Sequence, residues 1–100
     1  MKIRDEQGVL VVILDSECTI AKAEAHTHQL RSLISDKTGR IEVRAGAAEE
    51  MDTAYFQMLL SLKATADTRK IPFEMPEASS EILRLCELYG VTLSPAQETA

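Results

Sequence analysis

The segment from Met51 to Leu60, MDTAYFQMLL, places an acidic residue and a hydroxyl directly before a dense apolar run. Asp52 is a favoured helix N-cap residue, because its carboxylate accepts hydrogen bonds from the free N–H groups of the first turn. Thr53 then lies close to the positive end of the helix dipole, where an anion is stabilised. A hydroxyl at this place can bind an anion or become one by modification. The alternative is an ordinary capped helix in which Thr53 has no further role.

The other residues with reactive side chains point away from catalysis and metal binding. Cys18 and Cys86 form no C-x-x-C pair, and we interpret them as buried free thiols. His26 and His28 are two residues apart, so on a helix they point about 200° from each other and cannot chelate one metal ion. The sequence contains no Gly-rich phosphate loop, no G-x-S-x-G and no nucleophile beside an obvious base. We expect no metal, no cofactor and no enzymatic activity.

Composition restricts the class of protein further. The 100 residues are 45% hydrophobic and 27% charged, which is typical of one compact soluble domain. A net charge of -5 argues against binding to duplex nucleic acid and fits poorly with anionic lipid. The longest apolar run, Val9 to Leu14, is far shorter than the roughly 20 residues of a membrane span. Without a signal-peptide pattern at the N-terminus, we predict a cytoplasmic protein with no direct membrane insertion.

Strand-like and helix-like segments alternate along the chain and would position Asp52 and Thr53 in the middle of an α/β domain. Thr19 and Ser79 are predicted to cap helices, and Gly90 is predicted to end the last one. We expect strands at Lys2–Asp5, Val9–Leu14, Arg40–Ala45 and Ile71–Met75, and helices at about Thr19–Asp36, Thr53–Asp67 and Ser79–Gly90. The unbroken apolar run Val9–Leu14 indicates a strand that is covered on both faces. These elements predict a mixed four- to five-stranded sheet with about three helices packed on it, followed by a flexible tail at 94–100. The predicted core contains Val11, Ile13, Ile41, Val43, Phe56, Leu59, Leu60, Ile82, Leu85 and Cys86.

The helix that begins at Thr53 is apolar on more of its circumference than one buried stripe requires. Phe56, Leu59 and Leu60 form one face at helical spacing. A second stripe, rotated about 100° from the first, contains Tyr55, Met58 and Leu62. Either this helix is deeply buried, or the second stripe is exposed as an interaction surface.

The order of the elements, with MDTAYFQMLL in the middle and SSEILRLCELYGV near the end, resembles the STAS family over Val9 to Leu93. This family of domains is shared by bacterial anti-sigma factor antagonists and sulfate-transporter tails. The resemblance implies a STAS domain at residues 1–93, with a small sheet flanked by helices on one side. It also implies that the loop before Asp52 and the first half of the following helix form the surface that binds a protein partner.

The three residues that follow Asp52 indicate which branch of the family this chain resembles. Phosphorylatable antagonists carry two consecutive hydroxyls, the second being the phosphate acceptor, and then Gly, whereas this chain has Thr53, Ala54 and Tyr55. The Asp-Thr-Ala triplet resembles the STAS subunit of the phospholipid-asymmetry ABC transporter and STAS proteins linked to chemotaxis systems.

Three functions remain open from the sequence. The first is a regulatory docking module that binds an ATPase subunit or a signalling protein, such as a chemotaxis component, through Asp52, Thr53, Tyr55, Met58 and Leu62. The second is an anti-sigma factor antagonist-like switch that a partner serine kinase phosphorylates at Thr53. The added charge beside Glu49, Glu50 and Asp52 would oppose this modification. The third is a small-ligand or nucleotide sensor.

Overall fold

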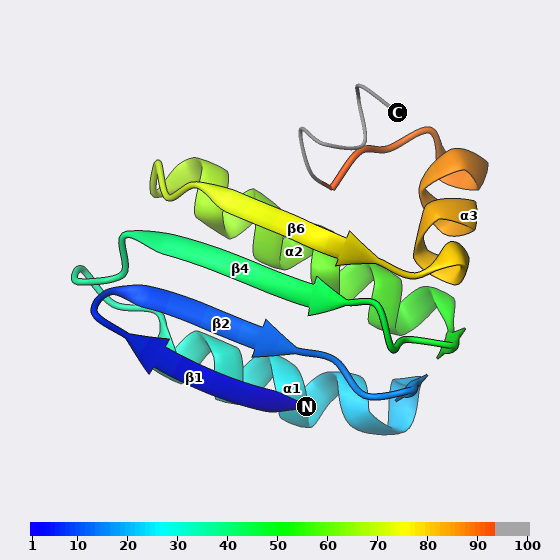
Figure 1. The fold of residues 1–100 in the computed structure, drawn as a ribbon, viewed down its shortest axis with the longest axis horizontal. Helices are drawn as coiled ribbons and strands as arrows, with labels where there is room; N and C mark the ends of the chain where they lie inside the picture. The colour runs from blue at the N-terminus through cyan, green and yellow to red at the C-terminus, as the bar shows by residue number, and fades with distance from the viewer. Residues whose placement is uncertain (94–100) are drawn as a thin grey trace.

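A four-stranded sheet forms one layer of the computed structural model, which describes residues 1–93 (Figure 1). Its strands follow the order β1-β2-β4-β6. The strand β1 pairs with β2 in the antiparallel sense, and the other two pairs are parallel. The strands are β1 (Lys2–Glu6), β2 (Val9–Ile13), β4 (Arg40–Ala45) and β6 (Phe73–Ala78).

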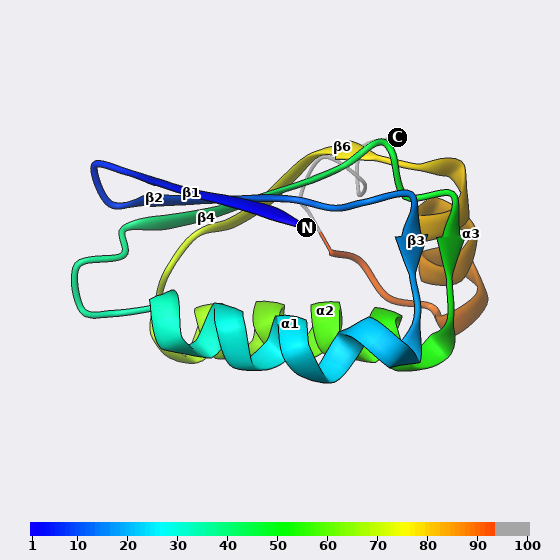
Figure 2. The ribbon, with the colours of Figure 1, turned by 90° about the horizontal axis from the view of Figure 1, so that it is seen from below.

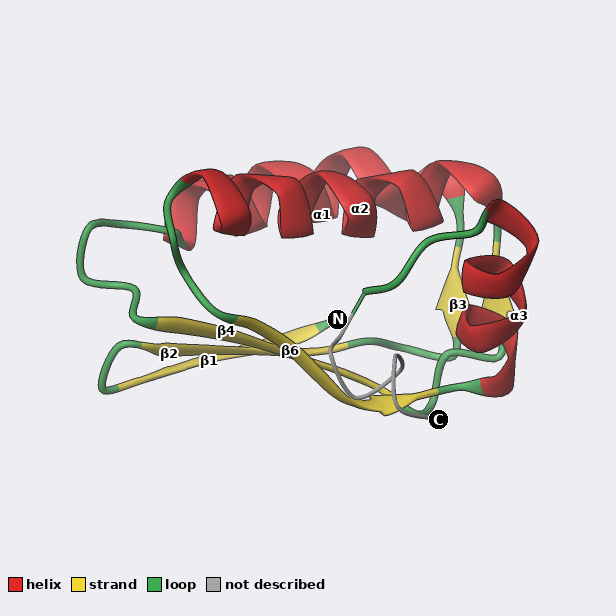
Figure 3. Cartoon of the chain, turned by 90° about the horizontal axis from the view of Figure 1, so that it is seen from above, coloured by secondary structure: helices red, strands yellow, loops and turns green. Residues whose placement is uncertain are grey.

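Two long helices form the second layer and cover one face of the sheet (Figure 2). They are α1 (Ile20–Leu33) and α2 (Thr53–Thr68). The third helix, α3 (Ser80–Tyr89), lies at one end of the domain, beside a short parallel ribbon of β3 (Glu17–Cys18) and β5 (Glu50–Met51) (Figure 3). The mixed sheet with three helices confirms the predicted fold class. The tail predicted at 94–100 lies outside the described residues.

The core lies between the sheet and the helices, because alternate residues of a strand point to opposite faces. Leu10 pairs with Ile41 and Val12 pairs with Val43, and all four side chains point toward the helices and are buried. Eight of the ten predicted core residues are buried: Val11, Ile41, Val43, Phe56, Leu59, Ile82, Leu85 and Cys86. The prediction is wrong for Ile13 and Leu60, which are only half-buried.

No helix of residues 1–93 lies over the opposite face of the sheet, so the expectation that the apolar run Val9–Leu14 is covered on both faces is wrong (Figure 2). Val11 lies on this face, outside the main core cluster. Charged side chains of β4 and β6 surround it instead, with Glu42 between Arg40 and Arg44 at 3.9 and 3.0 Å, and Arg40 3.6 Å from Glu74. These alternating charges keep the open face of the sheet compatible with water.

Candidate docking site at the start of α2

Asp52 connects the first turns of two helices. Its Oδ1 accepts a hydrogen bond from the Tyr55 amide at 3.0 Å, which confirms it as the N-cap of α2. Its Oδ2 accepts a hydrogen bond from the Ile20 amide at 2.6 Å, at the first residue of α1. Thr19 occupies the predicted N-cap position of α1, but its side chain makes no cap hydrogen bond. The carboxylate of Asp52 takes that role from 32 residues further along the chain.

Thr53 is exposed in the first turn of α2, and its hydroxyl lies 3.3 Å from the Tyr89 hydroxyl at the end of α3. The Tyr89 ring stacks on Phe56 with a centroid distance of 5.8 Å. A cleft of about 90 Å³ opens between the two helices. Its lining residues are Thr53, Phe56, Gln57, Leu60 and Tyr89. The start of α2 therefore forms one wall of an open apolar cleft.

Tyr89 was not identified as a site residue from the sequence. It falls in the apolar stripe of α3, which predicts a buried side chain, yet 49% of its surface is exposed. Gly90 follows it with a φ of +65° and ends the helix as predicted. An aromatic residue on the last turn of a helix is the one signal that marks this position.

The second stripe of α2 is buried, so the alternative in which it is exposed is wrong. Tyr55 has no exposed surface, and Met58 and Leu62 are also buried. The reason is that α1 packs alongside α2 and covers this side of it. Met58 and Leu62 face Leu30 of α1 across a small gap of about 40 Å³. These three side chains hold the two helices together and offer a partner no direct contact.

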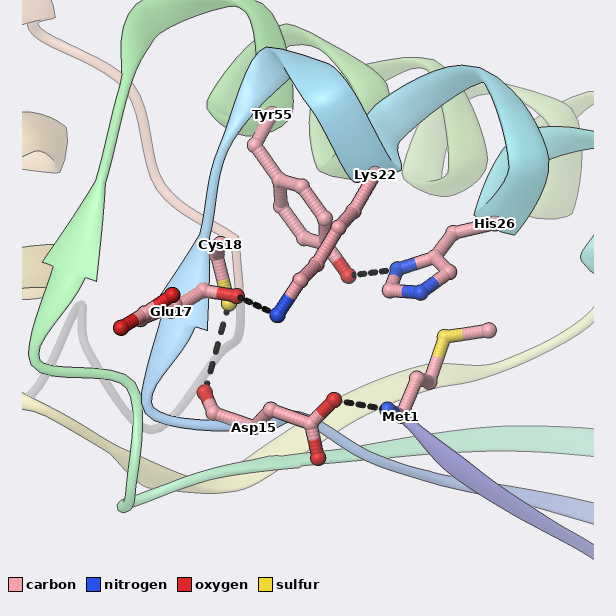
Figure 4. Close-up of polar contacts among 7 residues, drawn as sticks. All are labelled: Met1, Asp15, Glu17, Cys18, Lys22, His26 and Tyr55. Carbon is pink, nitrogen blue, oxygen red and sulfur yellow. Dashed lines mark hydrogen bonds and ion pairs between the residues drawn. The ribbon is translucent and has the colours of Figure 1, made fainter.

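A hydrogen bond between Tyr55 and His26 joins α2 to α1 (Figure 4). The Tyr55 hydroxyl lies 2.6 Å from His26 Nδ1, and the two rings meet edge to face. Burial raises the pKa of Tyr55 far above its ordinary value, so the phenol keeps its proton. The hydroxyl and His26 Nδ1 therefore share one hydrogen bond between two neutral groups, and the tautomer of the imidazole sets which of them donates.

The surroundings of His26 also favour its neutral form. Burial lowers the pKa of His26, and the charges of the Met1 ammonium and Lys22 lower it further, while Asp15 raises it. The Met1 ammonium itself forms an ion pair with Asp15 (Figure 4). Neutral His26 thus stabilises the contact that positions the first turn of α2.

The protein should lose stability as the pH falls below about 6.5, the pKa of an unperturbed histidine. Because the pKa of His26 is lowered in the fold, the unfolded chain takes up a proton first, and unfolding becomes easier until folded His26 is also protonated. Urea unfolding between about pH 5 and pH 8 measures this slope. His26→Gln should flatten it, whereas His28→Gln, at an exposed position of the same helix, should leave it unchanged. An equal slope in wild type and His26→Gln would contradict the assignment.

Cys18 is a buried free thiol, as predicted, and Cys86 is also buried. The Cys18 thiol lies 3.4 Å from the backbone oxygen of Asp15, and burial raises the pKa of this thiol to about 11. A thiol with that pKa is a poor nucleophile at neutral pH. Within residues 1–93, no group of three or more His, Cys, Asp or Glu side chains is arranged to hold a metal ion.

The first turns of α1 and α2 lie at the same end of the domain as α3 (Figure 3). The large apolar side chains that are exposed among the described residues belong to the start of α1 and to α3. Ile20 is 68% exposed beside Asp52, and Leu88 is 64% exposed on α3. We define the helix-start surface as Ile20, Thr53, Gln57, Leu60 and Tyr89. It combines exposed apolar groups with the cleft between α2 and α3.

Negative charge borders the helix-start surface. Glu17 of β3 pairs in register with Glu50 of β5, and Glu49 precedes Glu50. All three carboxylates are exposed, and none of them forms an ion pair within residues 1–93. Like charges directly opposite each other destabilise a pair of strands. The Lys22 ammonium donates to the backbone oxygen of Glu17 at 3.3 Å, and the three carboxylates form an acidic border next to an apolar surface.

None of the helices formed by residues 1–93 combines the length and the apolar character that crossing a membrane requires.

Comparisons with known proteins bear on the whole described domain. Residues 1–93 match the family described as Mlab, STAS domain. No curated protein matches the sequence significantly. Among solved structures, the NMR structure of the protein TM1081 has a TM-score of 0.73 at 11% identity, with 97% of this chain and 83% of that chain covered. That likeness shows a shared fold, and the family match extends over nearly the entire sequence. The chain belongs to the STAS family of regulatory and interaction domains.

Proposed function

We propose that this protein is a non-catalytic regulatory module that docks a cytoplasmic protein partner through the helix-start surface. The observation that carries the proposal is the exposed apolar cleft beside Thr53, bordered by the half-exposed ring of Tyr89. Exposed apolar surface with an aromatic anchor is typical of protein interfaces. STAS domains act in general as interaction modules, which agrees with this use of the surface.

The residues named from the sequence divide into two groups under this proposal. Thr53 contacts the partner, together with Gln57, Leu60 and Tyr89 around the cleft. Asp52 positions this surface, because its carboxylate binds the first turns of both α1 and α2. Tyr55, Met58 and Leu62 act from inside by fixing α2 against α1.

The partner class follows from the family branch. The Asp-Thr-Ala triplet at Asp52 favours the ATPase subunit of an ABC transporter, and a signalling protein such as a chemotaxis component is the other candidate of the same class. Both are cytoplasmic proteins that a small acidic domain can bind without a membrane segment of its own.

Site-specific photo-crosslinking in the native host tests the docking surface. A benzophenone amino acid replaces Gln57, which is exposed in the cleft, and in a matched strain it replaces Arg4, which is exposed on β1. We expect one discrete adduct from position 57 and none from position 4, with the partner identified by mass spectrometry. An adduct from position 4 alone would place the interface on the sheet and overturn the proposal.

A phosphorylated switch at Thr53 is the second candidate function. The observation in its favour is that the Thr53 hydroxyl is exposed at a helix N-terminus, where a phosphate gains from the dipole and the free N–H groups. Glu49 and Glu50 oppose it by repulsion. Mass spectrometry of protein from growing cells distinguishes the candidates: phosphate on Thr53, absent from Thr53→Ala, supports the switch, and unmodified Thr53 in partner-bound protein supports constitutive docking.

A further inference from the structure

The cleft between α2 and α3 has the size and lining to receive one aliphatic side chain. Its volume is about 90 Å³, and its apolar walls come from Phe56, Leu60 and the ring of Tyr89. An apolar cavity of about 150 Å³ holds a benzene molecule, so this smaller cleft has room for one side chain of the size of leucine. Thr53 and Gln57 add a hydroxyl and an amide that can bind the backbone of an incoming segment.

The charge around the cleft indicates what flanks that side chain. Asp52 directly precedes Thr53, and Glu49 and Glu50 lie in the segment before it. Glu50 is paired in register with Glu17, and α3 packs beside this ribbon (Figure 3). The three glutamates form no ion pair within the described chain, and the Lys22 ammonium donates only to the backbone oxygen of Glu17, at 3.3 Å. A partner that carries positive charge would therefore relieve the repulsion among these carboxylates.

We infer that the occupant of the cleft is a segment of a partner protein in which an aliphatic side chain is flanked by Lys or Arg. The inference rests on the docking function proposed above and adds the chemistry of the partner. The aliphatic group fills the cleft, and the basic groups lie against Glu17, Glu49 and Glu50. Binding of this kind combines an apolar anchor with salt-sensitive charge complementarity.

Three synthetic peptides test the inference by NMR titration of the isotope-labelled full chain. The first has a central Leu between two Lys-Arg pairs, the second has Ala in place of Leu, and the third has Glu in place of every Lys and Arg. The first should shift the amide signals of Thr53, Gln57 and Tyr89, and the shifts should shrink as salt is added. The Ala peptide should bind about tenfold more weakly, because one buried aliphatic group is lost. The Glu peptide should leave these signals in place.

Variants of the protein separate the two parts of the interaction. Glu49→Gln with Glu50→Gln should weaken binding of the Leu peptide. Asp5→Asn with Asp36→Asn makes the same change in net charge at exposed positions of β1 and of the loop after α1, and should not weaken binding. Gln57→Trp places a large ring at an exposed position of the cleft and should abolish the shifts. The amide spectrum of each variant shows directly whether it is folded.

Equal binding of the Leu and Ala peptides would overturn the apolar anchor, and equal binding of the Leu and Glu peptides would overturn the charge requirement. Absence of shifts around the cleft, combined with a crosslinked adduct from position 57 in the host, would overturn this inference while the docking function stands. Absence of both the shifts and the adduct would overturn the docking function as well.

Discussion

Leu59→Ala should lower the free energy of unfolding by about 2–5 kcal/mol, the range for truncating a buried leucine that leaves a cavity. Leu59 is fully buried on the side of α2 that faces the sheet, within the cluster that contains Ile41, Val43 and Ile82. The surrounding side chains belong to both layers of the domain and cannot close the cavity without moving the sheet relative to the helix. Urea unfolding followed by circular dichroism measures the loss.

Leu60→Ala is the matched control, because it removes the same atoms at the next position of the same helix. Leu60 is half-buried and lines the open cleft, so its truncation should cost about 1 kcal/mol. A loss below about 1 kcal/mol for Leu59→Ala, or equal losses for the two variants, would contradict the position of α2 on the sheet.

Local signals predicted the elements that position the site. Asp52 and Ser79 cap α2 and α3 through their side chains, and Gly90 ends α3 in the left-handed conformation, all as the sequence indicates. Each of these features depends on residues within one helical turn, which is why a single sequence reveals it. Alternation of apolar residues likewise revealed β4, where Ile41 and Val43 are buried.

The site itself depends on contacts between distant segments, and there the sequence is ambiguous. The spacing of Tyr55, Met58 and Leu62 is compatible with both an exposed and a buried stripe, because periodicity does not indicate which side of α2 packs against α1. The bond from Asp52 to Ile20 spans 32 positions and has no local pattern. The ribbon of β3 and β5 has two residues in each strand, too few for a periodic signal.

These contacts change the expectation for the second stripe. If Met58 and Leu62 were exposed, truncating them would weaken partner binding and leave the free energy of unfolding unchanged. Because they are buried between α1 and α2, they contribute mainly to the free energy of unfolding. The residues expected to contact the partner are instead those that line the cleft: Thr53, Gln57, Leu60 and Tyr89.

Thr53→Glu should weaken binding of the native partner by at least about 2 kcal/mol, or about 30-fold, the scale of an interface hot spot. Thr53 is exposed at the mouth of the docking cleft, so a carboxylate there must lose water when the partner binds. The fold should be retained, because an acidic residue in the first turn of α2 interacts favourably with the helix dipole.

The most direct test of the docking account is the dissociation constant of the crosslinked partner, measured by isothermal titration calorimetry for wild type, Thr53→Glu and Thr68→Glu. Thr68 is an exposed residue at the opposite end of α2, about 22 Å from Thr53 along the helix, and receives the same substitution. The account predicts a rise of about 30-fold or more for Thr53→Glu and wild-type affinity for Thr68→Glu. Wild-type affinity for Thr53→Glu, with the variant folded, would contradict it.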